Sequence, residues 1–86
     1  MPVKNLLIVY HNFCMTNSTI KLIQEKIKFY RTKKGLTQDK LSEMCHISSD
    51  YLSEIERGKK VPSLKRLLII INVLDISLSE FFSNIK

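Results

Sequence analysis

The sequence is poor in residues that interrupt, cross-link or stiffen a chain. Its 86 residues include two glycines, two prolines, two cysteines and no tryptophan. Two isolated cysteines exclude the disulfide framework of a small secreted domain. Scarce glycine and proline beside 44% apolar residues argue against a disordered, low-complexity chain. A chain of this length buries a single core, so we expect one ordered domain.

Membrane-spanning runs and metal-ligand clusters are also missing from the sequence. The apolar run at residues 6–9 stops at Tyr10, which makes it too short for a secretion signal or a membrane span. His11 and His46, even together with the two cysteines, match no zinc-binding spacing. We therefore expect a cytoplasmic protein with no membrane contact, no metal and no cofactor.

The charged residues are segregated along the chain. Within an overall net charge of +6, residues 1–34 carry +6, residues 35–56 carry −4 and residues 57–66 carry +5. Two basic clusters on either side of an acidic centre favour binding of a polyanion at two places. A solvated charged surface without a partner is the alternative.

The pattern from Thr19 onward predicts an all-α domain of five short helices. Apolar residues recur there at spacings of three and four, and glycines stand where helices are expected to end. Helices this short are not stable alone, so their apolar stripes must share one core. The expected helices are residues 19–34, 38–45, 49–57, 64–74 and 78–85, the last four capped by Thr37, Ser48, Ser63 and Ser77.

Two further expectations concern burial and the N-terminal segment. In the second of these helices we expect Leu41, Met44 and Cys45 to be buried. Residues 1–18 form an extension, with a β-leaning run followed by a polar stretch, while residues 19–86 form the folded domain. The extension is interpreted as strand-like, as disordered, or as a product of translation from an upstream start, and the residues leave these alternatives open.

The most informative pattern is a pair of short helices joined by a tight turn at residues 46–48. Such a pair allows one helix to lie in the DNA major groove while the other braces it across the backbone. Three motifs surround it: Arg31-x-x-x-Gly35-Leu36-Thr37-Gln38-x-x-Leu41, Ile47-Ser48-x-x-Tyr51-Leu52-Ser53-x-Ile55-Glu56-x-Gly58 and Pro62-Ser63-x-x-x-Leu67. Through these motifs residues 20–85 resemble the lambda-repressor-like (XRE-type, Cro/repressor-like) helix-turn-helix family.

Two residues of the turn depart from the family pattern. The family usually has a small residue before the turn and glycine within it, where this chain has Cys45 and His46. Cysteine is small enough for a close helix contact, and histidine tolerates a positive φ better than a β-branched residue does. We therefore expect the turn to keep its conformation.

The resemblance, together with helix geometry, implies which residues contact DNA. The outward face of the third helix lies opposite Leu52 and Ile55, and its residues are those expected to read base edges: Ser49, Asp50, Ser53 and Glu54. The best base partner of the two carboxylates is the N4 amino group of cytosine, and surface acids that make no contact are the alternative. Phosphate contacts are expected from Gln38, Tyr51, Arg57, Lys59, Lys60 and Ser63.

Two more sets of residues are assigned structural roles. The resemblance implies an ion pair between Arg31 and Glu56 that ties the first helix to the third. The last helix carries more large apolar surface than a monomer of this size easily covers. Its dimer-interface candidates are Leu78, Phe81, Phe82 and Ile85, and closure of the monomer core by the two phenylalanines is the alternative.

The sequence therefore predicts a non-enzymatic regulator of transcription, encoded by a bacterium or a phage. We expect it to bind double-stranded DNA as a homodimer, as a repressor on a palindromic operator. A restriction-modification controller or an antitoxin that represses its own operon is the alternative within this class. From another class, the acidic third helix predicts a protein-interaction module that binds no DNA.

Overall fold

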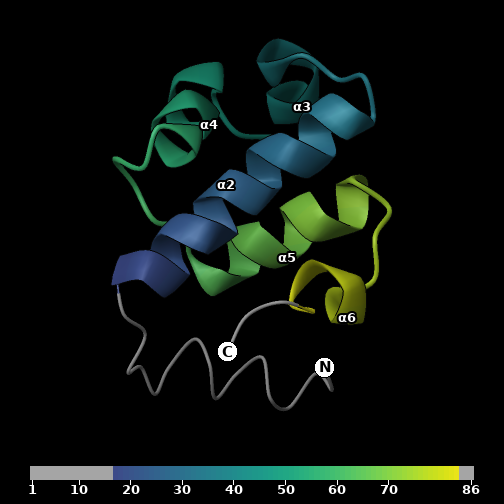
Figure 1. Cartoon of the computed structure of the whole chain (residues 1–86). Helices are drawn as coiled ribbons and strands as arrows, with labels where there is room; N and C mark the ends of the chain where they lie inside the picture. Colours follow the sequence, from purple (N-terminus) through teal and green to yellow (C-terminus); the bar gives the residue numbers. More distant parts are fainter. Residues whose placement is uncertain (1–16, 84–86) are drawn as a thin grey trace.

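The computed structural model describes residues 17–83, and this part of the chain has no strand. It consists of five helices: α2 (Asn17–Lys33), α3 (Gln38–Cys45), α4 (Ser49–Glu56), α5 (Leu64–Val73) and α6 (Leu78–Phe81). Helix α3 packs against α4 and α5, and α2 packs against α4. In the view of Figure 1, α3 and α4 lie to one side of α2, and α5 and α6 lie to the other. The prediction of an all-α domain with five helices is confirmed.

Hydroxyl side chains start four of the helices, as the sequence predicts. In each case the side-chain oxygen accepts a hydrogen bond from the backbone N–H three residues further on, which satisfies a donor that the helix itself cannot. Each of these bonds fixes the residue at which its helix begins. The cap and donor pairs are Thr37 with Lys40, Ser48 with Tyr51, Ser63 with Arg66 and Ser77 with Glu80.

The turn between α3 and α4 depends on a left-handed residue. His46 has φ 58° and ψ 41°, and its N–H donates to the carbonyl of Glu43 while the N–H of Ile47 donates to the carbonyl of Ser42. This conformation costs a residue with a Cβ about 1–2 kcal/mol. The turn therefore keeps its shape with histidine in place of the family's glycine, as expected, but at a cost in stability.

All five helices contribute to the core, but one predicted core residue of α3, Met44, does not belong to it. Leu41 and Cys45 are buried at 0% and 3% exposure, but Met44 is 41% exposed, so the expectation that Met44 is buried is wrong. The small Ser42 is buried instead, at 4% exposure. Because Leu41, Ser42 and Cys45 form the inward stripe, Met44 is turned toward solvent.

The helix ends differ from the prediction by a few residues. Helix α2 begins at Asn17, so it includes two residues that we had assigned to the extension. Helix α6 is short, ending at Phe81 with a turn at residues 82–83. The predicted form of residues 1–16 and the predicted role of Ile85 concern positions outside the described residues.

Within residues 17–83 no helix is long and apolar enough to cross a membrane. The same residues contain no group of three or more side chains that could hold a metal ion.

Candidate nucleic-acid interface

Helix α4 has an apolar inner face and a polar outer face. Leu52 and Ile55 are both 0% exposed, because they insert into the core. On the opposite side Asp50 is exposed, and the remaining base-reading candidates are half-exposed. The structure therefore brings the four candidates together on one accessible face: Ser49, Asp50, Ser53 and Glu54.

Cations from the C-terminal end of α4 and the following loop modify the charge of this face. Lys60 Nζ lies 3.4 Å from Glu54 Oε1, and Arg57 Nε donates to Ser53 Oγ at 3.2 Å. No cation of residues 17–83 lies within ion-pair distance of Asp50. Asp50 is therefore the carboxylate of this face that has no ion-pair partner. The carboxylate of Glu54 already pairs with Lys60, so a base would compete with Lys60 for it.

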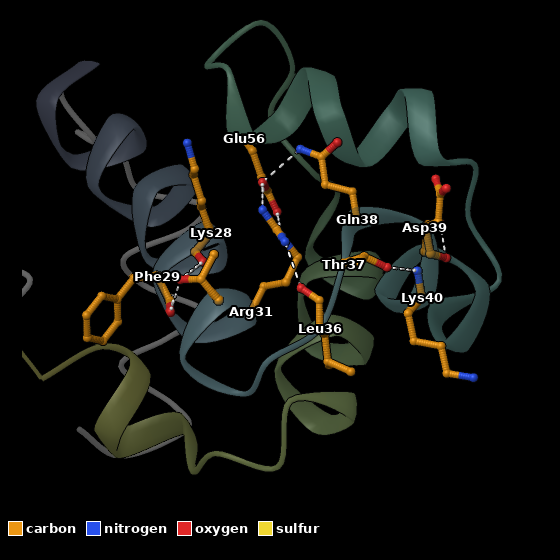
Figure 2. Close-up of polar contacts among 11 residues, drawn as sticks. Lys28, Phe29, Arg31, Leu36, Thr37, Gln38, Asp39, Lys40 and Glu56 are labelled. Carbon is orange, nitrogen blue, oxygen red and sulfur yellow. Dashed lines mark hydrogen bonds and ion pairs between the residues drawn. The ribbon is translucent and has the colours of Figure 1, made fainter.

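A buried ion pair holds α4 in place (Figure 2). Arg31 of α2 donates from Nε to Glu56 Oε2 at 2.7 Å and from Nη2 to Glu56 Oε1 at 3.0 Å, and the two side chains are 11% and 2% exposed. Arg31 Nη1 also donates to the carbonyl of Leu36 at 2.7 Å. The ion pair expected from the resemblance is present, and it is bidentate.

Gln38 joins this pair from the first turn of α3. Its Nε2 donates to Glu56 Oε1 at 3.0 Å, so Glu56 accepts hydrogen bonds from both α2 and α3 (Figure 2). Gln38 was predicted to contact a phosphate, and its bond to Glu56 was not predicted. Gln38 is half-exposed and is the first residue of α3, where a helix leaves backbone N–H groups without an intrahelical partner. Contact with phosphate remains a prediction for this residue.

The loop after α4 presents three exposed cations, Arg57, Lys59 and Lys60. The backbone N–H groups of Lys59 and Lys60 donate to the carbonyl of Glu54, and the buried Gln24 of α2 donates from Nε2 to the carbonyl of Lys60 at 2.7 Å. Gln24 was not predicted, because nothing in its local sequence indicates a partner 36 residues away. These bonds fix the cationic loop beside α4.

The remaining phosphate candidates lie where α4 and α5 begin. Tyr51 is half-exposed, with Lys60 Nζ at 5.8 Å and the guanidinium carbon of Arg66 at 5.4 Å from its ring centroid. The hydroxyl of Ser63 accepts the N–H of Arg66 at 3.2 Å, so it is used as a helix cap. Arg66 was not among the predicted site residues, although its place in the second basic cluster could have indicated it.

The structure corrects the predicted dimer interface. Phe81 and Phe82 are 0% and 1% exposed within a single chain, with ring centroids 5.0 Å apart, so they belong to the core and not to a surface that a partner contacts. Lys26 of α2 donates to the carbonyl of Phe81 at 2.6 Å. Burial lowers the pKa of Lys26 below its usual value, although the nearby Glu80 acts in the opposite direction. Of the described interface candidates, only Leu78 remains half-exposed.

Two short helices joined by a left-handed turn, with the second helix presenting a polar face beside clustered cations, define a helix-turn-helix domain. The helix-turn-helix family model HTH_3 matches residues 27–81, and the chain belongs to this family. The family expected from the sequence motifs is thereby confirmed.

The chain is similar in sequence to known regulators and in structure to a solved one. The chain is 39% identical over 57 residues to the HTH-type transcriptional regulator SinR of Bacillus subtilis (strain 168), covering 65% of this chain and 51% of that protein. It is 37% identical over 57 residues to the immunity repressor protein of Bacillus phage phi105, covering 66% of this chain and 40% of that protein. The crystal structure of the clp gene regulator ClgR from Corynebacterium glutamicum superposes with a TM-score of 0.71 at 29% identity, covering 76% of this chain and 69% of that one.

These relatives are longer than the match. The chain spans about half or less of the length of the first curated relatives that it matches. Their names are those of transcriptional regulators, which agrees with the expectation that the chain is not an enzyme.

Proposed function

We propose that this protein is a sequence-specific regulator of transcription that binds double-stranded DNA, acting as a repressor. The observation that carries the proposal is the outer face of α4, where four polar side chains are accessible while Leu52 and Ile55 anchor the helix in the core. A helix with this exposure suits the major groove, where side chains read base edges. The names of a phage immunity repressor and of SinR among its relatives support the same function.

Charge placement supports DNA over a protein partner. The acidic balance of residues 35–56 suggested a protein-binding surface, and Asp39 and Glu43 of α3 are exposed. On α4 itself, however, Glu56 is buried against Arg31 and Glu54 is paired with Lys60. Asp50 is left as the exposed acid of α4, and its best base partner is the N4 amino group of cytosine. The cations of the following loop are in turn exposed and available to phosphates.

We further propose a homodimer on a palindromic operator. One α4 reads only a few base pairs, whereas two copies related by a two-fold axis read two half-sites about one helical turn apart. The half-exposed Leu78 on α6 is the described residue from which such a contact is built. Both recognition helices then enter successive major grooves on one side of the duplex.

Selection of binding sites from random DNA tests this function. We expect enrichment of a palindromic sequence, and an affinity for it that falls steeply between about 50 and 200 mM salt because several phosphates are neutralised. Absence of DNA binding at about 50 mM salt would refute the proposal and favour a protein partner. A monomeric mass in solution and a single, non-repeated motif would refute the dimer while leaving DNA binding intact.

A further inference from the structure

A hollow opens between the start of α4 and the first turn of α5. It has a volume of about 310 Å³ and is lined by His46, Ile47, Ser48, Tyr51 and Arg66. The guanidinium carbon of Arg66 lies 5.4 Å from the centroid of the Tyr51 ring. An arginine from α5 and an aromatic residue from α4 therefore meet at the same surface depression.

Arg66 is a cation that the described residues do not neutralise. Lys60, which also lies over the Tyr51 ring, is paired with Glu54 at 3.4 Å. No carboxylate of residues 17–83 lies within ion-pair distance of Arg66, and its side chain is exposed. Stacking on Tyr51 restrains the guanidinium, and a restrained guanidinium binds phosphate through two parallel hydrogen bonds.

The hollow lies on one flank of the face that is proposed to read bases. Residues of a helix are separated by about 100° around its axis, so Tyr51 lies beside Glu54 on one flank, while Ser49 and Glu56 lie on the other. Gln38 is bonded to Glu56 and so occupies that second flank. A helix in the major groove has a phosphate backbone along each side. The outer face of α4 is thus bordered by Gln38 on one side and by Tyr51 on the other.

We propose that this hollow binds a phosphate of the DNA backbone, with the Arg66 guanidinium and the Tyr51 hydroxyl donating to its non-bridging oxygens. The inference rests on the proposed function and adds Arg66 to the phosphate contact that the sequence predicted for Tyr51. It makes Arg66 a positioning residue that fixes α4 in the groove from the flank opposite Gln38. Because a phosphate carries no base identity, the contact contributes affinity and orientation but no sequence preference.

The test compares Arg66→Gln with Lys65→Gln in the full chain. The two variants remove the same charge from adjacent exposed positions of α5, but only Arg66 lines the hollow. Binding to a labelled mixed-sequence duplex of about three helical turns is followed by fluorescence anisotropy from about 50 to 200 mM salt. Thermal unfolding of each variant establishes that it is folded.

We expect Arg66→Gln to make the negative slope of log association constant against log salt concentration shallower by about 0.9. If the two curves meet at 1 M salt, this corresponds to about eightfold weaker binding at 0.1 M salt. Lys65→Gln should change this slope by clearly less, and Tyr51→Phe should weaken binding severalfold with an unchanged slope, because it removes a donor without removing a charge.

If wild type binds DNA but Arg66→Gln and Lys65→Gln show equal salt slopes, the proposed phosphate site is refuted and the proposed function is not. A wild type that shows no salt-dependent DNA binding overturns the proposed function as well.

Discussion

Substituting Glu56 by alanine removes a hydrogen-bond acceptor of α4 that receives donors from α2 and α3. Three hydrogen bonds are lost, two from Arg31 at 2.7 and 3.0 Å and one from Gln38 at 3.0 Å. The Arg31 side chain, 11% exposed, keeps only its bond to the carbonyl of Leu36 at 2.7 Å. The variant therefore leaves a positive charge largely buried without a counterion.

Stranding one partner of a buried pair costs about 3–5 kcal/mol. A domain of this size unfolds with about 5–15 kcal/mol, so the loss is a large share of its stability. Since 1 kcal/mol corresponds to roughly 4–8 °C in domains of 60–100 residues, we expect Glu56→Ala to lower Tm by about 12 °C or more. DNA affinity should fall only secondarily, because the Glu56 side chain is buried against Arg31 and is not itself exposed to DNA.

Thermal and urea unfolding followed by far-UV circular dichroism measure this loss. Glu54→Ala is the matched control on the same helix, because its pair with Lys60 is exposed and contributes at most about 1 kcal/mol. The double variant Arg31→Met/Glu56→Leu removes both charges and should recover most of the stability. A Tm for Glu56→Ala within about 4 °C of wild type would show that Arg31 does not depend on Glu56 as its buried counterion.

The remaining predictions concern the turn, the last helix and the buried thiol. His46→Gly should raise stability by about 1 kcal/mol, because His46 has φ 58°, whereas His46→Ala should not; equal melting curves for the two would contradict this. Phe81→Ala should cost about 3–5 kcal/mol through a core cavity, while Leu78→Ala should mainly shift the molecular mass measured by light scattering toward the monomer. Burial raises the pKa of the Cys45 thiol, so in a Cys14→Ser background stability should fall as pH rises above the unfolded thiol value of about 8.5. Denaturant titrations at several pH values should show this fall disappearing in Cys45→Ala.

Local signals in the sequence predicted the helices well. Thr37 and Ser48 cap the helices that were expected to start after them, and Gly35 and Gly58 adopt positive φ where helices were expected to end. Each of these features depends on residues within one helical turn. Such features are therefore readable without the tertiary structure.

Features that depend on distant neighbours were missed or misjudged. In an eight-residue helix the spacing of apolar residues does not decide whether Met44 or Ser42 faces the core; the packing partner decides it. Phe81 and Phe82 fill the core and not the predicted interface, because the sequence does not show how much space the other helices leave for them. The bond from Gln38 to Glu56 spans 18 residues and became visible only in the assembled fold.

The face of α4 that is proposed to read DNA can be tested by selecting binding sites from random DNA with three variants in parallel, Asp50→Ala, Ser53→Ala and Lys59→Gln. We expect Asp50→Ala to alter base preference at fixed positions of each half-site, where wild type favours C·G pairs, because Asp50 contacts base edges. Lys59→Gln should weaken binding to all sequences and keep the wild-type preference. An unchanged preference in Asp50→Ala, together with Ser53→Ala, would contradict the assignment of α4 as the helix that reads the DNA sequence.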